Sequence, residues 1–239
     1  MSEIFLDSAN LLDIEEISRW GIITGLTTNQ KIFLNEKGCN FEEQAKKILK
    51  MMRPFPVSLE GPNDLDGILQ AAIKYVDWGD NVVIKIPMLP NGDGLRAVKA
   101  LSMLNISTNV TACMTLNQAF LASKAGAAYV SLFYNRMIDW MIKQKKPHDV
   151  AIRYALDTIQ YTMEMLEREE SETQLIVGSI REPDDVNQIL SVYPDIITIP
   201  TSILRKMPQN DMTDKTLKDF DDAWKEFCKA EKKSDEVKT

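Results

Sequence analysis

One lysine stands inside a stretch that otherwise reads as a fully buried strand, the run Asn-Val-Val-Ile-Lys-Ile-Pro from Asn81 to Pro87. A continuous β-branched run is typical of a parallel strand covered on both faces, where an ammonium group loses its hydration. Desolvation lowers the pKa of Lys85 and favours a neutral amine, which can attack a carbonyl carbon and form a Schiff base. The alternative is a strand-end lysine that reaches solvent or pairs with a carboxylate.

Polar side chains recur at the C-terminal ends of the other expected strands. Residues two apart on a strand share a face. These pairs are Phe5 with Asp7, Thr27 with Asn29, Ser58 with Glu60, Val83 with Lys85, Asn109 with Thr111, Ser131 with Phe133, and Ser179 with Arg181. Strands often end in polar residues at a surface, but a buried lysine with two carboxylates and anion-binding groups indicates a site. We expect Asp7, Glu60, Lys85, Thr111 and Arg181 to converge at one mouth.

Eight short apolar runs alternate with amphipathic segments and would position these residues. The expected strands are Glu3 to Asp7, Ile22 to Thr28, Phe55 to Glu60, Asn81 to Pro87, Ile106 to Thr111, Ala128 to Phe133, Gln174 to Ser179 and Asp195 to Pro200. The expected helices are Leu12 to Trp20, Phe41 to Met52, Asp64 to Trp78, Gly94 to Leu104, Thr115 to Ala125, His148 to Glu169, Asp184 to Val192, Ser202 to Lys206 and Thr216 to Lys229.

This order of elements predicts the α/β class. Eight βα units in succession, with no hairpin signal, favour a single (β/α)8 TIM barrel with an extra C-terminal helix; a doubly wound open sheet is the alternative. The predicted domain covers residues 1–229. The tail, residues 230–239, is nearly all charged or small and is expected to fray.

Composition narrows the function classes. The 239 residues carry 35 acidic against 28 basic side chains, which disfavours a nucleic-acid partner. Cys39, Cys113 and Cys228 lack the spacing of a zinc site or a disulfide framework, so we expect a cytoplasmic protein. The N-terminus has no basic region followed by an apolar core, and no apolar run approaches about 18 residues. Neither secretion nor a membrane partner is expected.

A metal centre has little support in the sequence. His148 is the only histidine, which excludes a site of two histidines and one carboxylate. We expect no metal and no cofactor, with an all-oxygen magnesium site as the open alternative.

The motifs, taken together, resemble the small-subunit transaldolase and fructose 6-phosphate aldolase family over nearly the whole chain. The segments that carry the resemblance are Phe5-Leu-Asp-Ser-Ala-Asn10, Gly25-Leu-Thr-Thr-Asn29, Val82-Val-Ile-Lys-Ile-Pro87, Thr108-Asn-Val-Thr111, Tyr129-Val-Ser-Leu-Phe133 with Arg136, Gly178-Ser-Ile-Arg181, and Ile197-Thr-Ile-Pro200.

The resemblance implies a role for each matching residue. Lys85 would be the Schiff-base lysine of a class I enzyme, Asp7 the acid/base for carbon–carbon cleavage, and Glu60 with Thr111 a water-mediated proton relay. Two groups would bind substrate: Asn29, Asn109 and Ser131 the dihydroxyacetone hydroxyls, and Arg136, Ser179 and Arg181 the terminal anion, for which a guanidinium fork is suited. Thr27, Lys31 and Phe133 complete the substrate-binding candidates.

Two positions separate the activities within the family, where transaldolases carry Glu and Phe and aldolases carry Gln and Tyr. Glu60 and Phe133 favour a transaldolase of the pentose phosphate type. It would move a dihydroxyacetone unit from fructose 6-phosphate or sedoheptulose 7-phosphate to an aldehyde such as glyceraldehyde 3-phosphate or erythrose 4-phosphate. The alternatives are a fructose 6-phosphate aldolase, which is a lyase, and a non-catalytic protein that binds sugar phosphates.

The chain departs from the family pattern at Gln30-Lys31, where the family has Pro-Ser, and at Tyr134-Asn135, which replace a small pair. Lys31 adds a cation near the mouth, so a sulfonated ketose such as 6-deoxy-6-sulfofructose is an alternative donor. The segment from Thr213 to Trp224 resembles the family's last helix, which packs on a neighbouring subunit. The resemblance therefore implies a homo-oligomer, either a pentamer or a decamer.

Overall fold

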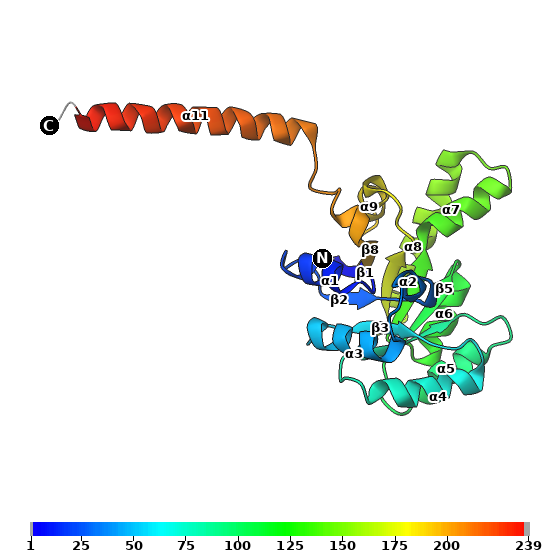
Figure 1. Cartoon of the computed structure of the whole chain (residues 1–239). Coiled ribbons are helices and arrows are strands. Elements are labelled where there is room, and N and C mark those ends of the chain that lie inside the picture. The colour runs from blue at the N-terminus through cyan, green and yellow to red at the C-terminus, as the bar shows by residue number, and fades with distance from the viewer. Residues whose placement is uncertain (1, 237–239) are drawn as a thin grey trace. The chain divides into compact units, whose positions relative to one another are not determined.

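Eight parallel strands close into a barrel in the computed structural model, which describes residues 2–236 (Figure 1). Each strand pairs with the next in the sequence, and β8 returns to pair with β1. The strands are β1 (Glu3–Asp7), β2 (Gly25–Thr27), β3 (Val57–Glu60), β4 (Val82–Pro87), β5 (Thr108–Cys113), β6 (Tyr129–Phe133), β7 (Gln174–Gly178) and β8 (Ile196–Pro200). The (β/α)8 TIM barrel is thereby confirmed, and the open sheet is excluded.

Helices follow the strands around the barrel (Figure 1). They are α1 (Leu11–Ser18), α2 (Gln30–Asn35), α3 (Phe41–Met52), α4 (Leu65–Val76), α5 (Asp93–Ser102), α6 (Leu116–Ala125), α7 (Tyr134–Lys143), α8 (His148–Arg168), α9 (Pro183–Leu190) and α10 (Thr201–Leu204). A further helix, α11 (Asp211–Glu236), belongs to a separate unit of the chain. Helices α2 and α7 are absent from the elements expected from the sequence. No helix in the described part of the chain is long and apolar enough to cross a membrane.

Strand alternation divides the barrel into an apolar outer face and a largely polar interior. The outward residues are buried under the helices, and they include Leu6, Leu26, Leu59, Ile84, Ile86, Val110, Val130, Leu132, Leu175, Val177, Ile197 and Ile199. This burial holds the helices on the sheet, because removal of apolar surface from water is the dominant favourable term in folding. The interior is therefore left free to carry polar groups.

An apolar layer fills the barrel toward the N-terminal ends of the strands. Phe5, Ile176 and Ile196 form a buried cluster, and Tyr129 packs against it. A Cβ at Gly25 would meet the Phe5 ring at 2.4 Å, so only glycine fits at this position. Phe5, Tyr129 and Ile196 each lie one interior position before a polar residue, which places the polar layer toward the C-terminal ends of the strands.

The chain divides into two compact units, the barrel through Ile203 and a second unit that begins at Leu204 and contains α11. Within the second unit, α11 begins earlier and ends later than the expected helix from Thr216 to Lys229. It also continues through residues 230–236, the first part of the tail that was expected to fray, while residues 237–239 lie outside the described residues. A single domain over residues 1–229 stays a prediction.

Candidate active site

Lys85 lies inside the barrel on β4, and its side chain is only 6% exposed. Its Nζ donates a hydrogen bond to the backbone oxygen of Thr28 over 2.8 Å. The Glu60 carboxylate lies 3.9 Å from Nζ, too far for a hydrogen bond but close enough for strong attraction. Glu60 and Lys85 are partners in the β3–β4 register, so adjacent parallel strands bring them together.

A chain of hydroxyls leads to the second carboxylate. The Thr27 hydroxyl donates to Asp7 Oδ1 over 2.7 Å, and Thr198 Oγ1 lies 2.6 Å from Thr27 Oγ1. Because the single Thr27 proton points to Asp7, Thr198 is the donor in the second bond. The two threonines therefore fix the orientation of the Asp7 carboxylate.

Burial dominates the electrostatics of these three groups. It raises the pKa of Asp7, against the opposing effects of the Lys85 charge and the Thr27 hydrogen bond. It lowers the pKa of Lys85, although Asp7 and Glu60 both counteract this shift. Desolvation thus favours the neutral amine needed for attack on a carbonyl, and it makes Asp7 a better proton acceptor than an exposed carboxylate.

Burial also raises the pKa of Glu60, while the charge of Lys85 and a hydrogen bond from the Gln30 side chain lower it. The Gln30 amide nitrogen donates to the backbone oxygen of Gly61 over 2.6 Å. Glu60 and Gln30 also line a cavity of about 570 Å³ beside Phe33 and Tyr75. Gln30, one of the departures from the family pattern, therefore contacts the carboxylate nearest to Lys85.

Polar side chains continue around the barrel interior from Lys85. Asn109, its register partner on β5, donates to Ser58 Oγ over 3.1 Å and accepts from Ser131 over 2.8 Å. Thr111 follows two residues later and is 2% exposed; its Oγ1 has no hydrogen-bond partner among the described residues. A buried hydroxyl without a protein partner is unusual, so Thr111 is a candidate to serve a ligand.

The expected anion-binding residues form a second group. Both guanidinium nitrogens of Arg181 contact the Asp139 carboxylate on α7, with Nη1 donating over 2.9 Å. Arg136, also on α7, lies close enough to Asp139 to lower its pKa, after the larger effect of Arg181. Ser179 has a positive φ of 65°, and its backbone oxygen accepts from Asn135 over 2.9 Å.

Three further candidates lie at the edges of these groups. Asn29 caps α2, since its Oδ1 accepts from the Ile32 backbone nitrogen over 2.9 Å. Lys31 is exposed in the first turn of α2 and lies outside the hydrogen-bonded network around Lys85. Phe133 is half-buried at the end of β6, in register with Gly178.

Sequence reasoning missed several members of both groups. Thr198 could have been found, because it precedes Pro200 by two residues and so faces the interior like the polar residues of the other strands. Ser58 was placed on the Glu60 face but not assigned to the site. Asp139 and Asn135 were missed because α7 was not predicted.

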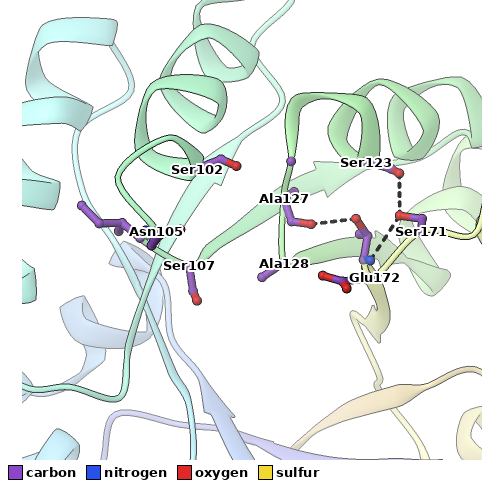
Figure 2. A pocket seen from close by; sticks show the side chains of 11 residues that line it. Ser102, Asn105, Ser107, Ser123, Ala127, Ala128, Ser171 and Glu172 are labelled. Carbon is purple, nitrogen blue, oxygen red and sulfur yellow. Dashed lines mark hydrogen bonds between the residues drawn. The ribbon is translucent and has the colours of Figure 1, made fainter.

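A separate cavity of about 480 Å³ lies where β5, β6 and β7 begin, the opposite end from Lys85. The Ser123 and Ser171 hydroxyls on its wall are hydrogen-bonded to each other (Figure 2), with 2.8 Å between the oxygens. The Thr173 hydroxyl donates to the Ala127 backbone oxygen over 2.7 Å. These groups satisfy each other, and the titratable groups described above are not part of this wall.

The fold is a (β/α)8 barrel whose interior holds a buried lysine and two carboxylates, Asp7 and Glu60. The transaldolase/fructose-6-phosphate aldolase family model matches residues 4–239. The chain belongs to that family and is an enzyme of the transaldolase type.

Curated relatives named "Probable transaldolase" agree with this assignment. One from Petrotoga mobilis is 36% identical over 226 residues, 94% of this chain and 96% of the relative. One from Nitrosopumilus maritimus is 36% identical over 231 residues, 96% of this chain and 97% of the relative. One from Aquifex aeolicus is 35% identical over 223 residues, 93% and 96% respectively.

Proposed function

We propose that Lys85 forms a Schiff base with a ketose donor and transfers its dihydroxyacetone unit to an aldehyde acceptor. The observation that carries the proposal is the burial of Lys85 between Asp7 and Glu60, which depresses its pKa inside the barrel. A neutral amine in that position is a nucleophile for the donor carbonyl, and loss of water from the adduct gives an iminium.

The iminium then serves as the electron sink for carbon–carbon cleavage. Asp7 removes the proton from the hydroxyl on the carbon being released, the bond breaks toward the iminium, and the first aldehyde leaves. The enamine on Lys85 attacks the acceptor aldehyde, and Asp7 returns the proton to the new hydroxyl. Water then hydrolyses the Schiff base and frees the amine. A raised pKa suits Asp7 to both proton transfers.

The remaining polar residues would position water and substrate. Glu60 and Thr111 would relay protons through a water during formation and hydrolysis of the Schiff base. Asn109, the register partner of Lys85, and Ser131, which donates a hydrogen bond to Asn109, would hold the dihydroxyacetone hydroxyls together with Asn29. Thr27 would act through Asp7, which it contacts.

The terminal anion of the donor would bind at Arg136, Ser179 and Arg181, with Lys31 as a further cation. By the family pattern the donor is a ketose phosphate, fructose 6-phosphate or sedoheptulose 7-phosphate. A sulfonated ketose is the second candidate, and the observation that favours it is the carboxylate already bound to Arg181. Glu60 and Phe133 favour transfer of the dihydroxyacetone unit over simple aldol cleavage.

We further propose that the protein is a cytoplasmic homo-oligomer.

Borohydride trapping tests the mechanism. Wild-type protein incubated with fructose 6-phosphate or dihydroxyacetone, then reduced, should carry a stable adduct on the peptide that contains Lys85. Lys85→Met, which keeps a side chain of similar length, should carry none while it remains folded. Absence of an adduct on folded wild-type protein would reject the proposal and leave the non-catalytic binding protein.

A second measurement separates transferase from lyase. Without an acceptor, a transaldolase holds the dihydroxyacetone unit on Lys85 and releases little of it. Rapid accumulation of free dihydroxyacetone from fructose 6-phosphate would instead assign an aldolase and overturn the argument from Glu60 and Phe133.

A further inference from the structure

The guanidinium fork at the proposed anion subsite already holds an anion that belongs to the chain itself. Asp139 on α7 binds Arg181 through both of its terminal nitrogens, the geometry in which a guanidinium group binds carboxylate or phosphate. The two side chains are 49% and 52% exposed, so a ligand can reach the pair. Any terminal group that uses this fork must share it with Asp139 or displace it.

A second carboxylate holds the backbone of Arg181 in place. Asp185 Oδ2 accepts from the Arg181 backbone nitrogen over 2.8 Å, from Glu182 nitrogen over 3.0 Å and from the Asn135 amide over 2.7 Å. Asp185 is thereby offset by three donors at the beginning of α9, where the helix dipole also favours a negative charge. Asp139 is thus the carboxylate that hydrogen-bonds to the guanidinium group, and the charge of Asp185 has a smaller effect on it.

Arg136 supplies the other positive charge of the subsite. No carboxylate in the described part of the chain forms an ion pair with it, and it lines a cavity of about 360 Å³ beside Trp140 and Tyr154. Asp139 lies at the guanidinium fork and offsets the charge of Arg181 there. With Asp139 in place, a bound terminal group therefore meets one positive charge fewer than the two arginines would otherwise present.

We propose that Asp139 determines which anions this subsite accepts, and that in its presence the subsite favours a singly charged terminal group. A phosphate monoester carries about −1.5 to −2 charges at pH 7 and more nearly two at pH 8, whereas a sulfonate of similar shape carries one. Asp139 repels the second charge of the phosphate and leaves the sulfonate less affected. This inference rests on the proposed function for its link to the donor, since it concerns the anion subsite of that same site.

The test measures binding of two small anions of similar shape at pH 8, methyl phosphate and methanesulfonate, by calorimetric titration. Wild-type protein should bind methanesulfonate at least as tightly as methyl phosphate. Asp139→Asn should tighten the binding of methyl phosphate about tenfold, since removal of a like charge beside the bound anion changes the affinity by roughly a factor of ten. It should tighten the binding of methanesulfonate less. Asp139→Ala, which also removes the hydrogen bonds to Arg181, should shift the ratio in the same direction.

Glu15→Gln provides the matched control, because Glu15 pairs with Arg19 in an exposed ion pair on α1. It should leave the ratio of the two affinities at the wild-type value. A strong wild-type preference for methyl phosphate, or equal effects of Asp139→Asn on both anions, would overturn the inference. Binding needs no turnover, so these outcomes are distinct from failure of the borohydride test, which would reject the proposed chemistry alone.

Discussion

Replacement of Thr111 by valine should raise the stability of the protein and lower its activity. Thr111 Oγ1 is buried and has no hydrogen-bond partner among the described residues, so valine breaks no protein hydrogen bond. A buried, unsatisfied hydroxyl costs about 1–3 kcal/mol. We therefore expect the free energy of unfolding to rise by about 1 kcal/mol, at the low end of that range, and Tm by about 2–4 °C.

The same change should damage the reaction. If the Thr111 hydroxyl orders the water that relays protons to Glu60, its loss removes an acid–base contribution that is typically about 10²–10⁴-fold. We expect kcat for dihydroxyacetone transfer to fall about 100-fold, the lower end of that range. Denaturant titration gives the stability, and a coupled assay of the released aldehyde gives the rate.

Thr108→Val is the matched control on the same strand. Thr108 is fully buried, its Oγ1 also has no partner in the described part of the chain, and strand alternation points it away from the barrel interior. It should show a similar gain in stability with wild-type turnover. If Thr111→Val loses stability, or if both variants keep full activity, the role assigned to the Thr111 hydroxyl is wrong.

Three further predictions concern the charged groups. Asp7→Asn should raise the free energy of unfolding at pH 7, because burial raises the pKa of Asp7 and its ionised form destabilises the fold; the gain should disappear as the pH falls toward about 4, where the unfolded carboxyl also protonates. Equal stability of the two proteins from pH 4 to pH 8 would contradict this. Gln30→Leu should shift the acidic limb of the pH profile of kcat to higher pH, because the hydrogen bond that lowers the pKa of Glu60 is lost. An acidic limb at the wild-type pH would show that Gln30 does not set the pKa of Glu60 in the reaction. Arg181→Ala should reduce kcat/KM for fructose 6-phosphate at least tenfold more than for neutral dihydroxyacetone, as expected for loss of a charge-assisted hydrogen bond, and equal losses would disprove its role as an anion anchor.

The sequence was sufficient to predict the barrel because each strand is a short apolar run bounded by turn residues. The expected strand from Glu3 to Asp7 and the expected helix from Phe41 to Met52 match β1 and α3. Strand β2 is shorter than expected and begins at Gly25, where the Phe5 ring fills the space of a side chain. Helix α2 is only six residues long and was not predicted.

Helix α7 was missed for a different reason. It begins directly after Phe133, with no intervening turn residue, so strand and helix run together in the sequence. Its buried residues Tyr134, Met137, Ile138 and Met141 do have helical spacing, which was the available signal.

The site residues on strands were predicted from the sequence, and the contacts made by loops and by α7 were not. The alternation of side chains along each strand predicted that Asp7, Glu60 and Lys85 face the barrel interior, because this alternation is regular and depends only on neighbouring residues. The contact of Arg181 with Asp139 joins residues 42 positions apart, on a loop and a helix, and it depends on packing that no periodicity encodes. Whether each residue plays its assigned role stays a prediction.

The apolar layer of Phe5, Ile176 and Ile196 closes the barrel on the N-terminal side of Lys85. Under the proposed chemistry, the donor, the first aldehyde, the acceptor and the hydrolytic water all share the opening at the C-terminal end. The first aldehyde must therefore depart before the acceptor reaches the enamine, and a complex of both substrates with the enzyme does not form. Initial rates at several fixed acceptor concentrations should then give parallel double-reciprocal lines, the pattern of a double-displacement enzyme.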